Sequence, residues 1–139
     1  MIGIYKITNK INGKIYIGES IDIEKRWNVH RDSLNNKSHH SYKLQNDWNR
    51  YGEENFTFEL LEEINKVDDN NYITRMLCIY IESKYIDQYN SIVSGYNVEN
   101  TMKNILCGKK TIMVQAFDYK YLAYLVNNLK KKKLKNLDQ

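Results

Sequence analysis

Proline is absent from this 139-residue chain, cysteine is rare, and long apolar runs are missing. Cys78 and Cys107 lie outside any CxxC or Cys/His cluster, so the sequence indicates neither a disulfide framework nor a zinc site, and we expect two buried free thiols. The longest strongly apolar run, Met76 to Ile81, is too short to span a bilayer, and no apolar leader with a cleavage site precedes it. We therefore expect a soluble, intracellular protein.

Charge is divided unevenly along the chain, although 42% hydrophobic and 27% charged residues suit one compact core. Residues 1–50 carry nine Lys/Arg against five Asp/Glu, residues 51–100 carry three against ten, and residues 101–139 carry nine against two. We expect the acidic middle to face away from any polyanion. The basic run of Lys130, Lys131, Lys132 and Lys133 is either a solvated tail or a segment that contacts phosphates.

Two short strings near the N-terminus, Gly3-Ile4-Tyr5 and Tyr16-Ile17-Gly18, lie in runs of β-branched and aromatic residues. The Asn12-Gly13 pair between them is the strongest short-range signal for a hairpin turn. Pairing of the two strands would bring Tyr5 and Tyr16 together on one small sheet, where each can present a phenolic oxygen to a reacting centre. Packing alone also favours tyrosine in hairpins, so this pattern does not decide between structure and chemistry.

The residues after the hairpin predict a helix over 20–34, because apolar residues and His30 recur at helical spacing there. Arg26 and His30 are one turn apart and project from the same face. A second helix should end at Gly52, a strand should follow from Phe56 to Leu61, and a long helix should run from Tyr72 to Tyr89. The order β-β-α-α-β-α predicts an α+β fold with a small three-stranded antiparallel sheet covered by helices.

The long helix should bury one stripe of its surface. Leu77, Ile81 and Tyr85 are expected to form that stripe, with Met76 and Tyr80 broadening it.

Further residues complete an ordered pattern: His39 in a Ser-His-His-Ser string, Glu82 in the long helix, and Gly95-Tyr96-Asn97. With the two strings and the helix carrying Arg26 and His30, this set resembles the GIY-YIG nuclease family over residues 1 to about 100. The phage and viral homing-type members are the most similar, since members of the excision-repair type resemble one another in having a lysine directly after the second string, where this chain has Glu19.

The resemblance implies a nuclease domain at residues 1–100 and a basic extension at residues 101–139. That extension is either a DNA-contacting appendage or a segment that packs on the core. It contains possible elements at residues 112–118 and 121–126.

The resemblance also implies a Mg²⁺-dependent DNA endonuclease that hydrolyses phosphodiester bonds, with Mn²⁺ as a substitute metal. Glu82 would be the metal ligand, since a carboxylate in an otherwise apolar helical stretch needs a partner and metal coordination supplies one. The alternative for Glu82 is an ion pair with Arg26, Arg31 or Lys84, or a position in solvent.

Each remaining site residue has an expected role. Arg26 would stabilise the transition state, and Tyr16 would orient or deprotonate the attacking water if its pKa is lowered by the metal and the arginine. Tyr5 would position water or phosphate. His30 would titrate near neutrality and relay the proton, or else pack against Trp27.

Three residues would support this chemistry: Gly18 at the end of the second string, His39 in contact with substrate or merely exposed, and Asn97 as a hydrogen-bonding brace. DNA is the expected partner, and the sequence indicates no membrane and no protein partner. Two other functions remain open. One is a DNA-binding protein that keeps the fold with weak or no catalysis, and the other is a structure-specific nuclease for branched DNA.

Overall fold

The computed structural model describes residues 1–106 of the chain. The elements in chain order are β1 (Gly3–Asn9), β2 (Ile15–Ser20), α1 (Ile23–Asn35), α2 (Tyr42–Tyr51), the short 3-10 helix η1 (Glu53–Asn55), β3 (Phe56–Glu63), α3 (Tyr72–Tyr89) and α4 (Thr101–Leu106). The predicted order of the strands and the three longer helices is confirmed, and η1 and α4 are additions to it. The possible elements at 112–118 and 121–126, Cys107 and the lysine run lie outside the described residues.

The chain divides into two compact units, Met1–Thr101 and Met102–Gln139. The first unit holds the whole sheet, α1, α2 and α3. No helix within residues 1–106 combines the length and the apolar character that crossing a lipid bilayer requires.

The three strands form one antiparallel sheet in the order β2-β1-β3, so β1 is the central strand. The predicted hairpin pairs β1 with β2, and Tyr5 lies opposite Gly18 while Ile7 lies opposite Tyr16. Its loop uses a positive φ of 75° at Gly13, a backbone conformation that glycine adopts without steric cost. The predicted sheet and fold class are therefore confirmed.

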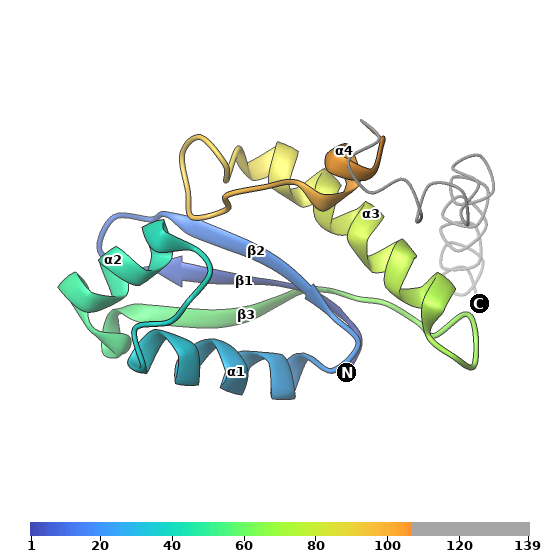
Figure 1. Ribbon diagram of the computed structural model, residues 1–139, viewed down its shortest axis with the longest axis horizontal. Helices are drawn as coiled ribbons and strands as arrows, with labels where there is room; N and C mark the ends of the chain where they lie inside the picture. Colours follow the sequence, from blue (N-terminus) through green and yellow to red (C-terminus); the bar gives the residue numbers. More distant parts are fainter. Residues whose placement is uncertain (107–139) are drawn as a thin grey trace, which may run out of the picture. The chain divides into compact units, whose positions relative to one another are not determined.

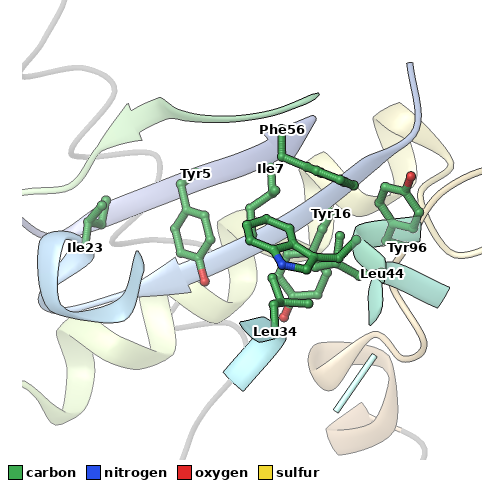
Figure 2. Close-up of a cluster of buried hydrophobic side chains, with 9 residues drawn as sticks. Tyr5, Ile7, Tyr16, Ile23, Leu34, Leu44, Phe56 and Tyr96 are labelled. Carbon is green, nitrogen blue, oxygen red and sulfur yellow. The ribbon is translucent and has the colours of Figure 1, made fainter. Parts of the chain in front are cut away.

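The two faces of the sheet carry different helices. Tyr5, Ile7 and Tyr16 lie on one face and form a buried cluster with side chains from α1 and α2, including Leu34 and Leu44 (Figure 2). Alternation along the strands directs their neighbours to the opposite face. Helix α3 packs against β2 and β1, and Figure 1 shows α1 and α3 on opposite sides of the sheet.

Local signals in the sequence begin and end the helices. Asp22 caps α1 by accepting a hydrogen bond from the backbone N–H of Lys25 at 3.2 Å. Ser41 does the same for α2 through the N–H of Leu44 at 3.3 Å. Helix α2 ends at Gly52, whose φ of 86° stops it at the predicted residue.

The buried side of α3 differs from the predicted stripe. Ile81, Tyr85 and Tyr80 are only half-buried. The buried residues of this helix are Thr74, Met76, Leu77, Cys78, Ile79, Ser83 and Ile86. The helix carries apolar residues around most of its circumference, so spacing alone could not select the face that packs on the sheet. Cys78 is a buried free thiol, as expected.

Candidate active site

Two tyrosines and a histidine form the centre of the site. The ring centroid of His30 lies 5.6 Å from that of Tyr5 and 5.3 Å from that of Tyr16, with both pairs edge to face. Tyr5 comes from β1, Tyr16 from β2 and His30 from α1, and all three are buried. The hairpin and the first helix thus bring together the phenols and the imidazole that the sequence predicted as site residues.

Gly18 provides the space for the ring of Tyr5. A Cβ atom added at Gly18 would lie 2.3 Å from both Cζ and Oη of Tyr5, a distance shorter than any real contact. Because Gly18 is the cross-strand neighbour of Tyr5, the last residue of the second string fixes where the phenol of the first string lies.

A chain of hydrogen bonds connects the loop after α1 to Tyr5. The backbone N–H of Ser41 donates to Nδ1 of His39 at 3.0 Å, Nε2 of His39 is 2.7 Å from Nδ1 of His30, and Nε2 of His30 is 2.6 Å from Oη of Tyr5. A backbone N–H is always a donor, so His39 carries its proton on Nε2 and donates to His30. His30 then carries its own proton on Nε2 and donates to the phenolic oxygen of Tyr5.

This loop is held in place by polar contacts with the rest of the domain. The hydroxyl of Ser41 donates to the backbone oxygen of Tyr96 at 2.5 Å. Gln45 accepts from the backbone N–H of His39 at 3.1 Å and donates to the backbone oxygen of Leu34 at 2.9 Å. The positions of His39 and His30 are therefore set by buried polar side chains, Ser41 before α2 and Gln45 within it.

Both histidines of this hydrogen-bonded series are neutral at physiological pH. Burial and the nearby charge of Arg26 lower the pKa of His30 to about 2, and burial lowers the pKa of His39 to about 4. The sequence predicted that His30 titrates near neutrality. The structure differs because the ring is only 1% exposed and its two nitrogens are both hydrogen-bonded. His39 lies in this network as well.

Arg26 is half-buried, and its guanidinium lies within hydrogen-bonding reach of the phenolic oxygens of Tyr5 and Tyr16. Burial raises the pKa of both phenols above their usual value, and the positive charge of Arg26 opposes that rise. The expected lowering of the Tyr16 pKa is thus absent in the protein alone, since burial and the negative charge of Glu82 outweigh the arginine.

Glu82 extends from α3 toward the same group of residues. Its carboxylate lies near the backbone N–H of Glu19, and its negative charge acts on both Tyr5 and Tyr16. Burial, followed by the negative charge of Glu19, raises the pKa of Glu82 to about 8, although Arg75 and Arg26 partly offset this. Among residues 1–106, Arg75 pairs with Glu19 at 3.6 Å.

Asn97 lies beside β2 and holds its backbone. Its side-chain Oδ1 accepts from the N–H of Ile17 at 2.8 Å, and its Nδ2 donates to the oxygen of Ile17 at 2.9 Å. Asn97 is 5% exposed and touches no reacting group through these bonds. Gly95 also lies close to β2, since an added Cβ would be 2.4 Å from the backbone oxygen of Ile15.

Sequence reasoning missed two residues of the site. Ser41 orients His39 through its backbone, which no side-chain pattern reveals. His40 places Nε2 at 3.1 Å from Oη of Tyr16. The Ser-His-His-Ser string was the available signal, but nothing in its residue types separates the second histidine from an exposed loop residue.

Comparisons with known proteins identify the family of this domain. The family model of the GIY-YIG catalytic domain matches residues 1–97 of this chain. Intron-associated endonuclease 1 of Enterobacteria phage T4 is 37% identical over 105 residues, which cover 76% of this chain and 40% of that protein. The chain thus spans less than half the length of this relative.

Solved structures give the same result. The catalytic domain of homing endonuclease I-TevI is 36% identical and superposes with a TM-score of 0.63, over 71% of this chain and 99% of that one. A mutant of the same domain gives the same TM-score and identity over 94% of its length. The chain therefore belongs to the GIY-YIG family of endonucleases, with residues 1–97 matching its catalytic domain.

Proposed function

We propose that this protein is a DNA endonuclease of the homing type that hydrolyses phosphodiester bonds with Mg²⁺, for which Mn²⁺ can substitute. One observation carries the proposal. Tyr5, Tyr16, Arg26, His30 and Glu82 come from four different elements. The ring of His30 contacts both phenols, and the charges of Arg26 and Glu82 act on both phenols. Such convergence of phenols, a guanidinium and a carboxylate suits the attack of water on a phosphate.

Endonucleases of this family generally use divalent metal ions, and the donor set here fits one. Burial, followed by the negative charge of Glu19, raises the pKa of Glu82, so a cation bound near these two carboxylates would favour their charged forms. No group of three or more His, Cys, Asp or Glu side chains suited to a metal occurs in the described part of the chain. Mg²⁺ accepts such a sparse set because it keeps several waters and takes phosphate oxygens as ligands.

Glu82 would hold this ion. When bound, the ion supplies positive charge that stabilises the charge developing on the phosphate oxygens.

Tyr16 is the residue that takes the proton from the attacking water in this proposal. His30 is excluded from that role, because its Nε2–H donates to Tyr5 and its Nδ1 accepts from His39. His30 instead orients the hydroxyl of Tyr5. The oxygen of Tyr5 accepts from His30, which leaves its hydrogen available for a water or a phosphate oxygen.

Arg26 is assigned to the charge on the phosphate. Its guanidinium is permanently charged, and its planar fork matches two phosphate oxygens. It lies beside both phenols, so a phosphate bound there would face the base and the cation together. This arrangement stabilises the pentavalent transition state more than the bound substrate.

The basic extension is the proposed source of long-range attraction for DNA. Residues 1–100 carry twelve Lys/Arg against fifteen Asp/Glu, whereas residues 101–139 carry nine against two. A domain with a net negative charge gains little from electrostatic steering by itself, so the extension would raise the rate of encounter with DNA.

Cleavage of supercoiled plasmid and of branched DNA, with Mg²⁺ or with EDTA, tests the proposed function. The full chain should cut only with the metal. Glu82→Gln should abolish cutting while DNA affinity is retained, because the amide keeps the shape and loses the charge. Asp87→Asn, which removes an exposed carboxylate from the same helix, is the matched control and should cut normally.

Two outcomes would contradict the proposal. DNA binding without any cleavage would favour a binding protein that retains the fold. Full activity of Glu82→Gln would remove Glu82 as the metal ligand. Cleavage confined to the branched substrate would change the substrate class and leave the chemistry in place.

A further inference from the structure

His40 lies between the buried Tyr16 and solvent. Its Nε2 is 3.1 Å from Oη of Tyr16, and the two rings meet edge to face with centroids 5.9 Å apart. Tyr16 is 7% exposed, whereas His40 is exposed. On its other side the ring of His40 stacks on His39 at a centroid distance of 4.4 Å. His40 is therefore held in place and still open to water.

Hydrogen-bond donation from Tyr16 to His40 is the direction that proton transfer requires. Nε2 of His40 is 3.1 Å from the phenolic oxygen of Tyr16, within reach of its hydrogen. When Tyr16 donates, the proton of neutral His40 lies on Nδ1.

Burial and the charge of Arg26 favour the neutral ring of His40. Burial and then the positive charge of Arg26 lower the pKa of His40 below its usual value, while the carboxylate of Glu99 acts in the opposite sense. His39 and His30, the other titratable groups near it, are neutral at physiological pH. The neutral ring, which has one nitrogen free to accept a hydrogen, is therefore favoured over the imidazolium.

Tyr5 has no such outlet. Its oxygen receives the Nε2–H of His30, and that direction is imposed from the backbone N–H of Ser41 through His39. Passing a proton from Tyr5 to His30 would require both imidazoles to change tautomer. The two phenols of the site are therefore inequivalent: Tyr5 faces an imidazole whose donor is fixed by the backbone, and Tyr16 faces an imidazole that is open to solvent.

We propose that His40 is the proton acceptor of Tyr16 during hydrolysis and the exit by which that proton reaches solvent. This inference rests on the proposed function and extends it to a residue outside the ordered motif set.

The proposed step balances in atoms and electrons. A water molecule transfers a proton to Oη of Tyr16 as its oxygen forms the new bond to phosphorus, and the phenol transfers its own proton to Nε2 of His40. The bond from phosphorus to the leaving oxygen breaks, and the leaving alkoxide takes a proton from solvent. The imidazolium of His40 then releases one proton to solvent. Exchange with solvent returns the neutral ring to the form with its proton on Nδ1.

This arrangement solves a problem that burial creates. The pKa of Tyr16 is raised by burial and by the charge of Glu82, so a free tyrosinate would be rare at neutral pH. Coupled transfer to His40 avoids the build-up of that anion, because the proton leaves the phenol as another arrives.

Single-turnover cleavage of plasmid DNA by the full-length protein in Mg²⁺ provides the main test, measured from mildly acidic to mildly alkaline pH. The wild-type rate should rise as His40 loses its proton. His40→Ala should cut roughly 10²-fold more slowly, the size expected for loss of a general base, and should lose that acidic limb. Added imidazole should restore His40→Ala and leave the wild type unchanged. Ser38→Ala, an exposed neighbour in the same loop, should behave as the wild type.

His40→Gln separates proton transfer from structure. Glutamine can still accept a hydrogen bond from Tyr16 but cannot take its proton, so folding should be retained while the acidic limb disappears. Wild-type rates in both His40 variants would overturn the inference and leave the proposed function standing. A loss of DNA affinity with an unchanged pH profile would overturn it as well, and would place His40 on the substrate.

A measurement on the resting protein is independent of cleavage. Histidine ¹⁵N NMR at slightly alkaline pH should show His40 with its proton on Nδ1, and His39 and His30 with theirs on Nε2. A proton on Nε2 of His40 would mean that it donates to Tyr16 and would refute the inference. If the wild type cut no DNA, the proposed function would fail and the catalytic role of His40 with it, whatever tautomer were found.

Discussion

Replacing Glu82 with glutamine should make the folded protein more stable at alkaline pH in the absence of metal. The pKa of Glu82 is about 8 in the folded state against 4.5 for an ordinary glutamate. The folded protein therefore binds more protons than the unfolded chain between these two values, and its free energy of unfolding falls as pH rises. This contribution is fully present below pH 4.5 and is lost as pH rises through 8.

The structure sets the size of the effect. Each unit of difference in pKa corresponds to about 1.4 kcal/mol, so the shift amounts to roughly 5 kcal/mol at most. Water reaches the half-buried carboxylate and screens part of it, so we expect about 2 to 4 kcal/mol. Glutamine does not titrate, and the stability of Glu82→Gln relative to wild type should therefore increase by this amount from acid to alkaline pH.

Urea unfolding followed by the fluorescence of Trp27 and Trp48 is the assay. The two proteins must be compared at each pH, since His30 and His39 have lowered pKa values and contribute stability that is lost as pH falls below their unfolded pKa of 6.5. That opposite trend is common to both proteins and cancels in the difference.

Added Mg²⁺ should change the comparison. The ion should stabilise the wild type, by about 2.7 kcal/mol at a hundred times its dissociation constant, and should leave Glu82→Gln unaffected. A stability difference that stays constant over the pH range would refute the reasoning on burial. Equal stabilisation of both proteins by Mg²⁺ would refute the assignment of the ligand.

Three further predictions concern other parts of the protein. Arg26→Lys keeps the charge but loses the planar fork, so single-turnover cleavage should slow by roughly 10²-fold with nearly normal DNA affinity; a change confined to KM would mean that Arg26 only docks the phosphate. Gly18→Ala places a Cβ 2.3 Å from Oη of Tyr5, so it should slow cleavage and lower the free energy of unfolding in urea by about 1 to 3 kcal/mol. An unchanged cleavage rate and an unchanged stability would contradict the close approach of Gly18 to Tyr5. Replacing the four lysines at 130–133 with glutamine should weaken binding to every DNA sequence and reduce the slope of log K against log salt by about 0.9 for each phosphate that these lysines neutralise. An unchanged slope would identify the lysine run as a solvated tail.

Much of the fold could be predicted because its signals are local. Asn12-Gly13 marks the hairpin turn, Gly52 ends α2, and α3 runs over the predicted residues. The face of α3 that packs on the sheet could not be predicted, since apolar residues surround most of that helix. Its buried side is selected by the sheet, a partner whose position no local pattern contains.

The site shows the same division. The two strings, Arg26 and Glu82 could be chosen from residue type and order. The hydrogen-bonding partner of each phenol could not be predicted, because the partners are distant in sequence. His30 lies 25 positions from Tyr5, and His40 lies 24 positions from Tyr16. The pKa of His30 was wrongly expected near neutrality for a related reason: burial is a property of the packed domain and outweighs the intrinsic value.

The bonds that Tyr96 and Asn97 make with β2 also protect the protein from other copies of itself. Strand β2 lies at an edge of the sheet, where one side has no neighbouring strand among residues 1–106. Tyr96 donates its N–H to the oxygen of Ile15 at 2.9 Å, and Asn97 engages both backbone groups of Ile17. Exposed N–H and C=O groups along such an edge are a template for pairing with another chain. By occupying them, these two residues act as a cover against aggregation, so a fragment that ends before Tyr96 would be prone to self-association even if its hairpin and helices formed.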